Sequence, residues 1–277
     1  MYVVATAGHV DHGKSTLVRA LTKMDPDRWE EEKRRGLTID LGFAWTTLPS
    51  GADVAFVDVP GHEKFLGNML AGVGPAPVVL FVVAADEGWQ AQSTDHRDAL
   101  RALGVEHGII ALTRYDRATE DHTAEIRAEL ADTPLADAPI IPVSAPTGEG
   151  VGQLRQALDE VLAAVPAPDA NAPVRLWADR AFSVKGAGTV VTGTFAAGTL
   201  RVGDSLQVAT ADGEKEVEIR GLHSENRAHD SLGPVTRAAV NLRGVDAAEL
   251  HRGDVLLTPG AWRLVEHLDV CLLYTSD

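Results

Sequence analysis

The stretch "GHVDHGKST", residues 8–16, decides the fold of the amino-terminal half of this 277-residue chain. It matches the pattern G-x-x-x-x-G-K-[S/T] and lies between an apolar run, "YVVATA" (2–7), and a segment of helical periodicity. In that context the backbone amides of the loop point at phosphate oxygens, and the lysine reaches the β and γ phosphates of a nucleotide. The predicted phosphate-binding residues are Gly8, His9, Val10, Asp11, His12, Gly13, Lys14, Ser15 and Thr16.

The rest of the amino-terminal half alternates apolar runs with amphipathic segments. Apolar runs recur at 54–59, 77–85, 107–113 and 138–144, and amphipathic segments at 92–104, 119–131 and 150–163. Continuous apolar strands that alternate with helices are typical of a sheet buried on both faces. The pattern predicts an α/β nucleotide-binding domain over residues 1–165, with a mostly parallel sheet and helices on both faces.

A different pattern follows the proline- and alanine-rich segment 162–174. Short alternating strands are cut by glycine turns at 186–188, 202–204 and 212–213. This spacing predicts an antiparallel β-barrel domain over residues 173–259. Residues 261–277 begin like a strand of a second barrel but are too few to fold alone, so we expect a truncated third domain there. They end in "CLLYTSD", and we assign Cys271 no role.

Composition excludes some classes of protein. The chain has 25 Lys and Arg against 40 Asp and Glu, a formal net charge of −15, which disfavours a general polyanion binder but leaves room for a local basic face. The single cysteine excludes an internal disulfide and favours a reducing compartment. The sequence begins without a signal peptide and has no run long enough to span a bilayer. We therefore expect a cytoplasmic monomer with no membrane partner.

A second phosphate-end motif, "DVPGH" (58–62), directly follows an apolar run. A carboxylate at the end of a strand, here Asp58, can hold Mg²⁺ together with the hydroxyl of Ser15. Gly61 allows a backbone amide to approach the γ phosphate, and His62 comes next, where it can orient an attacking water. The predicted catalytic residues are His62 and Lys14.

Three motifs together, "GHVDHGKST", "RRGLTID" (34–40) and "DVPGHEKFLGNM" (58–69), resemble the translation-factor GTPases, the group of elongation factor Tu. The resemblance implies GTP and GDP as ligands, Mg²⁺ as cofactor and the ribosome as partner. It implies that Thr38 is a further Mg²⁺ ligand, and that Val10 and Leu37 flank the water-positioning His62. It also implies a monovalent-cation role for Asp11.

The guanine-reading motif of that group is only partly present. Its N-K-x-D is replaced by Thr113-Arg114-Tyr115-Asp116, and the later Ser-Ala is found at Ser144 and Ala145. Asp116 can accept two hydrogen bonds from guanine that adenine does not offer, and the Ala145 amide can donate to guanine O6. We therefore expect guanine selectivity to survive, while Thr113 and Arg114 alter how tightly the base is held.

Four longer segments, 25–45, 62–74, 179–195 and 240–256, resemble the selenocysteine-specific elongation factors. The resemblance implies selenocysteinyl-tRNA as partner and a selenocysteine pocket at Asp179, Arg180 and Arg237. A selenol ionises below neutral pH and a serine hydroxyl does not, so fixed guanidinium groups would favour the selenocysteinyl ester. An mRNA hairpin would be read only by carboxy-terminal winged-helix domains that these 277 residues lack.

Three alternatives stay open on sequence grounds. The same motifs serve factors for ordinary aminoacyl-tRNA or initiator tRNA. A sulfate-activating GTPase shares the loop and the barrel, but such proteins tend to have Asp-Asp-Gly-Lys where this chain has Asp11-His12-Gly13-Lys14. A nucleotide-bound scaffold without turnover is disfavoured because the lysine, the Mg²⁺ ligands and His62 are all present.

Overall fold

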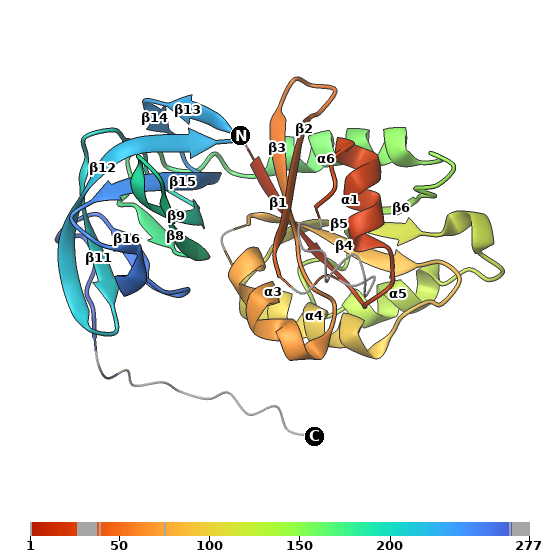
Figure 1. Ribbon diagram of the computed structural model, residues 1–277. Coiled ribbons are helices and arrows are strands. Elements are labelled where there is room, and N and C mark those ends of the chain that lie inside the picture. The colour runs from red at the N-terminus through yellow and green to blue at the C-terminus, as the bar shows by residue number, and fades with distance from the viewer. Residues whose placement is uncertain (1, 27–37, 39, 75, 266, 268–277) are drawn as a thin grey trace.

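A computed structural model describes residues 2–26, 38, 40–74, 76–265 and 267. The amino-terminal unit is a six-stranded sheet in the order β2-β3-β1-β4-β5-β6, shown on the right of Figure 1. Its strands are β1 (Tyr2–Ala7), β2 (Gly42–Thr47), β3 (Asp53–Asp58), β4 (Val78–Ala84), β5 (His107–Thr113) and β6 (Ile140–Pro142). All neighbours pair in parallel except β2, which is antiparallel to β3 at one edge. The predicted fold class, a mostly parallel α/β sheet, is confirmed.

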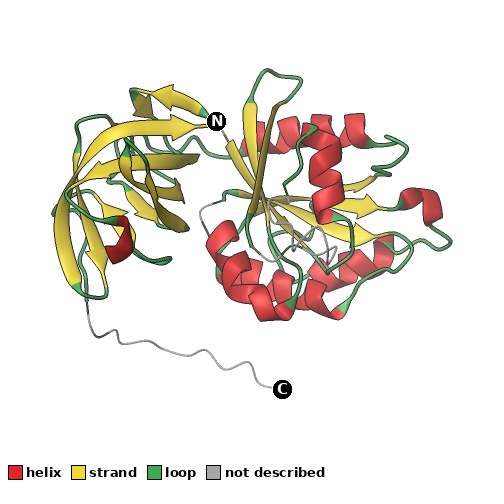
Figure 2. Cartoon of the chain, viewed as in Figure 1, coloured by secondary structure: helices red, strands yellow, loops and turns green. Residues whose placement is uncertain are grey.

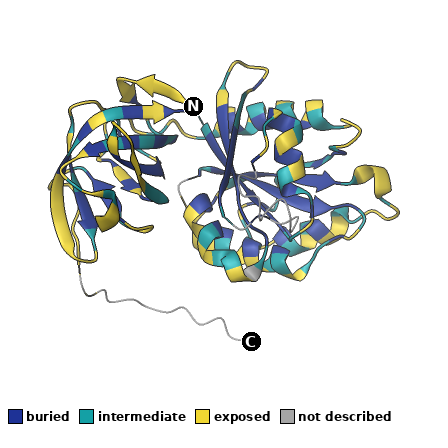
Figure 3. Cartoon of the chain, in the orientation of Figure 1, coloured by how far each residue is buried: buried dark blue, intermediate teal, exposed yellow. Residues whose placement is uncertain are grey.

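Helices cover both faces of this sheet (Figure 2). They are α1 (Lys14–Thr22), α3 (Leu66–Val73), α4 (Ala91–Ala102), α5 (Thr123–Leu130) and α6 (Val151–Ala164), with short 3-10 turns η1 (Glu63–Phe65) and η2 (Tyr115–Arg117). One hydrophobic core joins α1 and α6 to the sheet, and a second joins α3, α4 and α5 to its other face. The strands are accordingly the buried layer in Figure 3. The helix predicted over 119–131 begins later, because the Asp121 carboxylate accepts from the Thr123 amide at its start.

The second unit is an antiparallel barrel. Its strands are β7 (Arg175–Trp177), β8 (Arg180–Val184), β9 (Gly188–Phe195), β10 (Leu200–Arg201), β11 (Ser205–Thr210), β12 (Gly213–Ser224), β13 (Arg227–His229), β14 (Ser231–Leu232), β15 (Thr236–Arg243) and β16 (Val255–Leu257), with η3 (Ala247–Glu249). The barrel closes because β11 pairs with both β12 and β16. Alternate residues of β15, among them Ala238, Val240 and Leu242, enter its core. The barrel that the glycine spacing predicts is confirmed.

The carboxy-terminal end is described only in part. Residues 261–265 form no strand, and Trp262 donates its indole N–H to the carbonyl of Val174 at 3.0 Å. Cys271 lies outside the described residues, so the expected start of a second barrel stays a prediction.

The two units touch through one buried side chain in particular. Val235, between β14 and β15, is only 4% exposed and belongs to the core that α3, α4 and α5 form with the sheet. Its φ of 52° is a left-handed conformation that a β-branched residue rarely adopts. The barrel therefore contributes a side chain to the core of the other domain.

Candidate nucleotide site and domain interface

The loop between β1 and α1 has the conformation that phosphate binding needs. Gly8, Asp11 and Gly13 have φ values of 124°, 62° and 85°. A Cβ on Gly8 would overlap the carbonyl oxygen of Val82, and one on Gly61 would overlap Lys14 Nζ and the Val10 amide. Glycine at position 8 therefore lets the loop pack against β4, and glycine at position 61 lets the 58–62 motif approach the loop.

Lys14 points back over this loop. Its Nζ donates to the carbonyls of Gly8 at 3.0 Å and His9 at 2.7 Å. Burial lowers the pKa of Lys14 to about 8, against the opposing attraction of Asp58 and Asp11. A phosphate group beside the ammonium would raise this pKa again, so the site favours an anionic ligand.

Two side chains from α4 hold the same loop, and sequence reasoning missed both. The Gly8 amide donates to His96 Nδ1, and the Val10 amide donates to Gln92 Oε1, each at 3.0 Å. The signal was the four-residue spacing of Gln92 and His96, which places both on one face of the helix. Because these amides have protein acceptors here, the phosphate contacts of Gly8 and Val10 stay a prediction.

His12 supports the loop from inside the protein. Its buried ring accepts the Ala84 amide at Nδ1, at 3.2 Å, and lies 5.0 Å from the ring of His9. Burial, together with His9 and Lys14, lowers the pKa of His12 to about 3. Burial also lowers the pKa of His9, and Lys14 adds to that shift. Any phosphate contact of His12 would therefore come from its backbone.

Two of the three predicted Mg²⁺ ligands are in contact, and the third, Asp58, is near enough to Lys14 for its charge to raise the pKa of that lysine. Ser15 Oγ and Thr38 Oγ1 lie 2.9 Å apart. The buried Asp58 carboxylate accepts from Thr6 Oγ1 at 2.9 Å, and Thr6 Oγ1 accepts the Val59 amide at 3.0 Å. Hydroxyl and carboxylate oxygens are the ligands that Mg²⁺ prefers, so the residues fit this ion. The Thr6 contribution was not predicted.

His62 lies at the edge of the site, on the loop before η1. Its Nδ1 accepts the Lys64 amide at 3.2 Å, and its ring meets Phe65 edge-on with 6.0 Å between centroids. Val10 is partly buried, and Leu37 lies outside the described residues. The role of His62 in orienting water stays a prediction.

The base-reading motif is tied to the phosphate-binding loop. Thr113 Oγ1 donates to the His12 carbonyl at 2.6 Å, and the Arg114 guanidinium contacts the Asp11 carbonyl. Arg114 also pairs with Glu87 at 2.5 Å and with Asp86 at 3.4 Å, two carboxylates that sequence reasoning missed.

The last residue of the base-reading motif, Asp116, is in contact with Ser144. Asp116 is exposed, and a hydrogen bond from the Ser144 side chain lowers the pKa of its carboxyl. The carbonyl of buried Ser144 accepts the Gly148 amide at 2.9 Å, and Ala145 lies in the turn that this bond closes. The carboxylate that would read guanine therefore stays ionised at neutral pH.

The predicted selenocysteine pocket lies where the barrel meets β2. Both Asp179 oxygens are 3.0 Å from an Arg237 nitrogen, and that guanidinium lies 3.5 Å from the ring centroid of Phe43. Arg180 instead donates to Asp40 Oδ2 and to the Leu41 carbonyl, both at 3.0 Å. The structure thus brings Asp179, Arg180 and Arg237 together, but each arginine has a different acidic partner.

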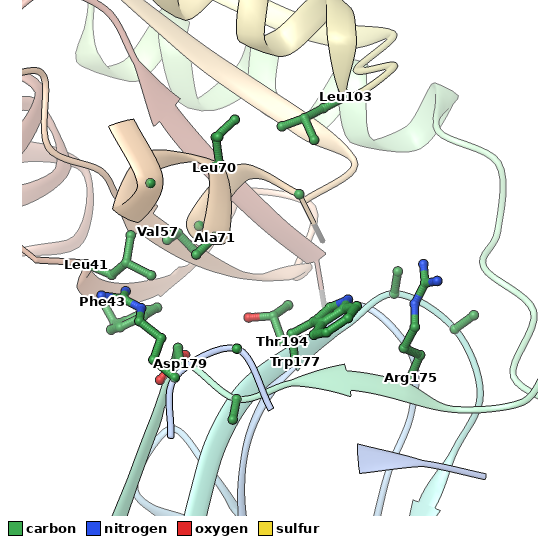
Figure 4. A pocket seen from close by; sticks show the side chains of 18 of the residues that line it. Leu41, Phe43, Val57, Leu70, Ala71, Leu103, Arg175, Trp177, Asp179 and Thr194 are labelled. Carbon is green, nitrogen blue, oxygen red and sulfur yellow. The ribbon is translucent and has the colours of Figure 1, made fainter. Parts of the chain in front are cut away.

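A cavity of about 590 Å³ opens beside these residues (Figure 4). Leu41, Phe43, Leu70 and Ala71 line it from the α/β domain, and Trp177, Asp179 and Thr194 from the barrel. An apolar cavity with a charged edge between two domains is a typical ligand site.

A phosphate-binding loop on a mostly parallel sheet, followed by a closed barrel, defines a P-loop nucleotide-binding protein with a β-barrel second domain. Residues 1–164 match the family described as elongation factor Tu GTP binding domain, and residues 188–257 match elongation factor Tu domain 2. The chain belongs to this family of translational GTPases.

Its relatives narrow the family further. The chain is 42% identical to the selenocysteine-specific elongation factor of Desulfomicrobium baculatum, over 93% of this chain and 41% of that protein. It matches the crystal structure of a bacterial selenocysteine-specific elongation factor, EF-Sec, with a TM-score of 0.85 and 36% identity, over 93% of this chain and 45% of the other. It also matches translation elongation factor SelB from Methanococcus maripaludis in complex with the GTP analogue GPPNHP, with a TM-score of 0.82 and 28% identity, over 93% and 55%. The resemblance to selenocysteine-specific factors is confirmed, and the chain spans about two fifths of the curated relative's length.

Within the part of the chain that the structure describes, no helix has both the length and the apolar character that crossing a membrane requires.

Proposed function

We propose that this chain is a GTP-dependent translation elongation factor that binds selenocysteinyl-tRNA, delivers it to the ribosome and hydrolyses GTP as a timed switch. The position of Arg237, which pairs with the cavity-lining Asp179, and of Arg180, which donates to the carbonyl of the cavity-lining Leu41, is the observation that carries the proposal beyond GTP binding. We also propose that the protein acts as a monomer in the cytoplasm. An mRNA hairpin would be recognised by domains outside these residues.

GTP binding is supported by the loop geometry. Lys14 lies over the loop and would move from the Gly8 and His9 carbonyls to the β and γ phosphates. Ser15, Thr38 and Asp58 would hold Mg²⁺, which neutralises charge on the phosphates when bound. Asp11 would face a monovalent cation, and Asp116 with Ala145 would select guanine.

For hydrolysis, we propose that a water attacks the γ phosphate in line, oriented by His62. The Gly61 amide would donate to the γ phosphate, and the glycine leaves room for Lys14 beside it. In this structure Nδ1 of His62 accepts the Lys64 amide, which leaves Nε2 to contact the water. Ribosome binding would bring the ring to the γ phosphate, which makes the hydrolysis ribosome-stimulated.

Substrate selection would rest on charge. The selenolate side chain of the selenocysteinyl ester would bind the guanidinium groups of Arg180 and Arg237, whereas the neutral hydroxyl of the seryl ester would not. A charge-assisted hydrogen bond contributes about 1.5–3 kcal/mol, which corresponds to roughly 10- to 100-fold preference.

The decisive experiment compares protection of selenocysteinyl-tRNA and seryl-tRNA against deacylation by the GTP-loaded chain. We expect preferential protection of the selenocysteinyl ester, lost in Arg237→Ala and retained in the control Arg243→Ala, whose side chain is exposed on the same strand. Equal protection of both esters would favour a factor for ordinary aminoacyl-tRNA or initiator tRNA.

A further inference from the structure

Asp40 has contacts that nothing in the proposed function uses. Its Oδ2 accepts from Arg180 at 3.0 Å, and its Oδ1 lies 3.1 Å from Arg252 NH2. Both arginines belong to the barrel, whereas Asp40 precedes β2 of the α/β domain. One carboxylate therefore bridges the two domains at the edge of the cavity.

The same short segment reaches the nucleotide site. Asp40 comes two residues after Thr38, whose hydroxyl lies 2.9 Å from Ser15 Oγ in the phosphate-binding loop. Two residues span at most about 7 Å, so a displacement of Thr38 must be taken up close to Asp40. Arg252 also donates to Asn68 in α3, at 2.8 Å, and α3 follows the 58–62 motif. Both segments that would sense the γ phosphate thus contact Arg252 of the barrel, one through Asp40 and the other through Asn68.

The Asp40 carboxylate competes with an anionic ligand for Arg180. One Arg180 nitrogen, Nη2, donates both to Asp40 and to the Leu41 carbonyl, so Asp40 neutralises the guanidinium that would otherwise attract a selenolate. Arg237 is fixed differently, by Asp179 of its own domain and by the ring of Phe43. Arg252 offers Asp40 a second cation, so the carboxylate can leave Arg180 and remain paired.

We propose that Asp40 is a specificity-determining residue of the aminoacyl site, since its carboxylate occupies Arg180 until the nucleotide state draws it toward Arg252. The identity of the anionic ligand in this inference rests on the proposed function. The ion pair between Asp40 and Arg180 is independent of the proposed function. When GTP and Mg²⁺ hold Thr38, Arg180 becomes available to an anionic aminoacyl side chain. With GDP bound, Asp40 returns to Arg180 and the site disfavours the substrate.

The reactivity of Arg180 toward phenylglyoxal, measured by peptide mass spectrometry on the whole chain, tests the occupancy directly. We expect Asp40→Asn to raise it about two- to fivefold, the factor that corresponds to a partly exposed ion pair. The matched control is Glu129→Gln, which removes a carboxylate from Arg97 in the same domain and should raise only the reactivity of Arg97. Unchanged Arg180 reactivity in Asp40→Asn would overturn the inference.

The second arm compares the GDP and GPPNHP forms. In the wild-type chain the GTP analogue should raise the reactivity of Arg180, and in Asp40→Asn the two forms should be equally reactive. Equal reactivity of the two wild-type forms would overturn the coupling to nucleotide. Because neither arm contains tRNA, both outcomes stand apart from the tRNA-protection experiment, whose failure would refute the selenocysteine assignment alone.

Discussion

Thr113 and Arg114 replace the asparagine and lysine that usually read guanine, yet both bind the phosphate-binding loop. Thr113 reaches the His12 carbonyl with its short hydroxyl, and Arg114 reaches the Asp11 carbonyl with the far end of its guanidinium. Glu87 and Asp86 hold the other side of that guanidinium. Thr113 and Arg114 therefore still connect the base-reading motif to the phosphate-binding loop, although different side-chain atoms make the contacts.

Asp116 should determine the choice of base. An amide at this position donates where guanine also donates, so Asp116→Asn should shift preference from guanine toward xanthine nucleotides. Competition of GDP, ADP and XDP against a fluorescent GDP analogue measures this. Equal displacement by ADP and GDP in the wild-type chain would refute guanine selectivity itself.

Gly61 should not tolerate a side chain. A Cβ there would overlap Lys14 Nζ and the Val10 amide, so Gly61→Ala should push the 58–62 motif away from the loop. We expect intrinsic GTP hydrolysis to fall about 100-fold, the usual effect of losing one preorganised donor, with GDP binding little changed. Gly67→Ala, at an open position in α3, is the control.

At the scale of elements, α4 acts as a support for the phosphate-binding loop. His96 and His12 accept backbone amides only as neutral rings, and burial lowers the pKa of each to about 3. Helix α4 was predictable from its periodicity, but its contacts to the loop were not, because they depend on how helix and sheet pack. The same limit applies to β2, whose antiparallel pairing depends on the turn before β3.

These two histidines should make the chain sensitive to acid. Between about pH 6.5 and pH 3 the unfolded chain binds protons that the folded chain does not, so the free energy of unfolding falls as pH falls. Each of these histidines lowers the free energy of unfolding by up to about 1.4 kcal/mol for every pH unit within this range. Urea unfolding at several pH values should show a shallower dependence in His96→Gln than in the wild-type chain. The exposed His229→Gln should keep the wild-type slope.

At the scale of the whole molecule, charge divides the two domains. Residues 1–172 carry 14 Lys and Arg against 26 Asp and Glu, whereas residues 173–260 carry 10 against 11. Most of the net negative charge thus lies in the α/β domain. The nearly neutral barrel repels the phosphates of an RNA less than the α/β domain does. Composition predicted the total, but which ions meet at the interface, such as Arg180 with Asp40, depends on how the domains dock.

Docking of the domains should depend on Val235. A charge at this buried position costs several kcal/mol, so Val235→Asp should separate the barrel from the α/β domain. Small-angle scattering should report a larger radius of gyration, and calorimetry two unfolding transitions in place of one. Val202→Asp, at an exposed barrel position, should leave both measurements unchanged.

Val235 also bears on the order in which the chain is made. Val235 completes the core of a domain formed by residues up to about 165. During synthesis that domain therefore emerges from the ribosome well before residue 235 does. During that interval the receiving surface, around Ala76 and Val105, has no cover from the barrel. A nascent chain halted between residues 165 and 235 should therefore be a better client for a holding chaperone than the finished protein.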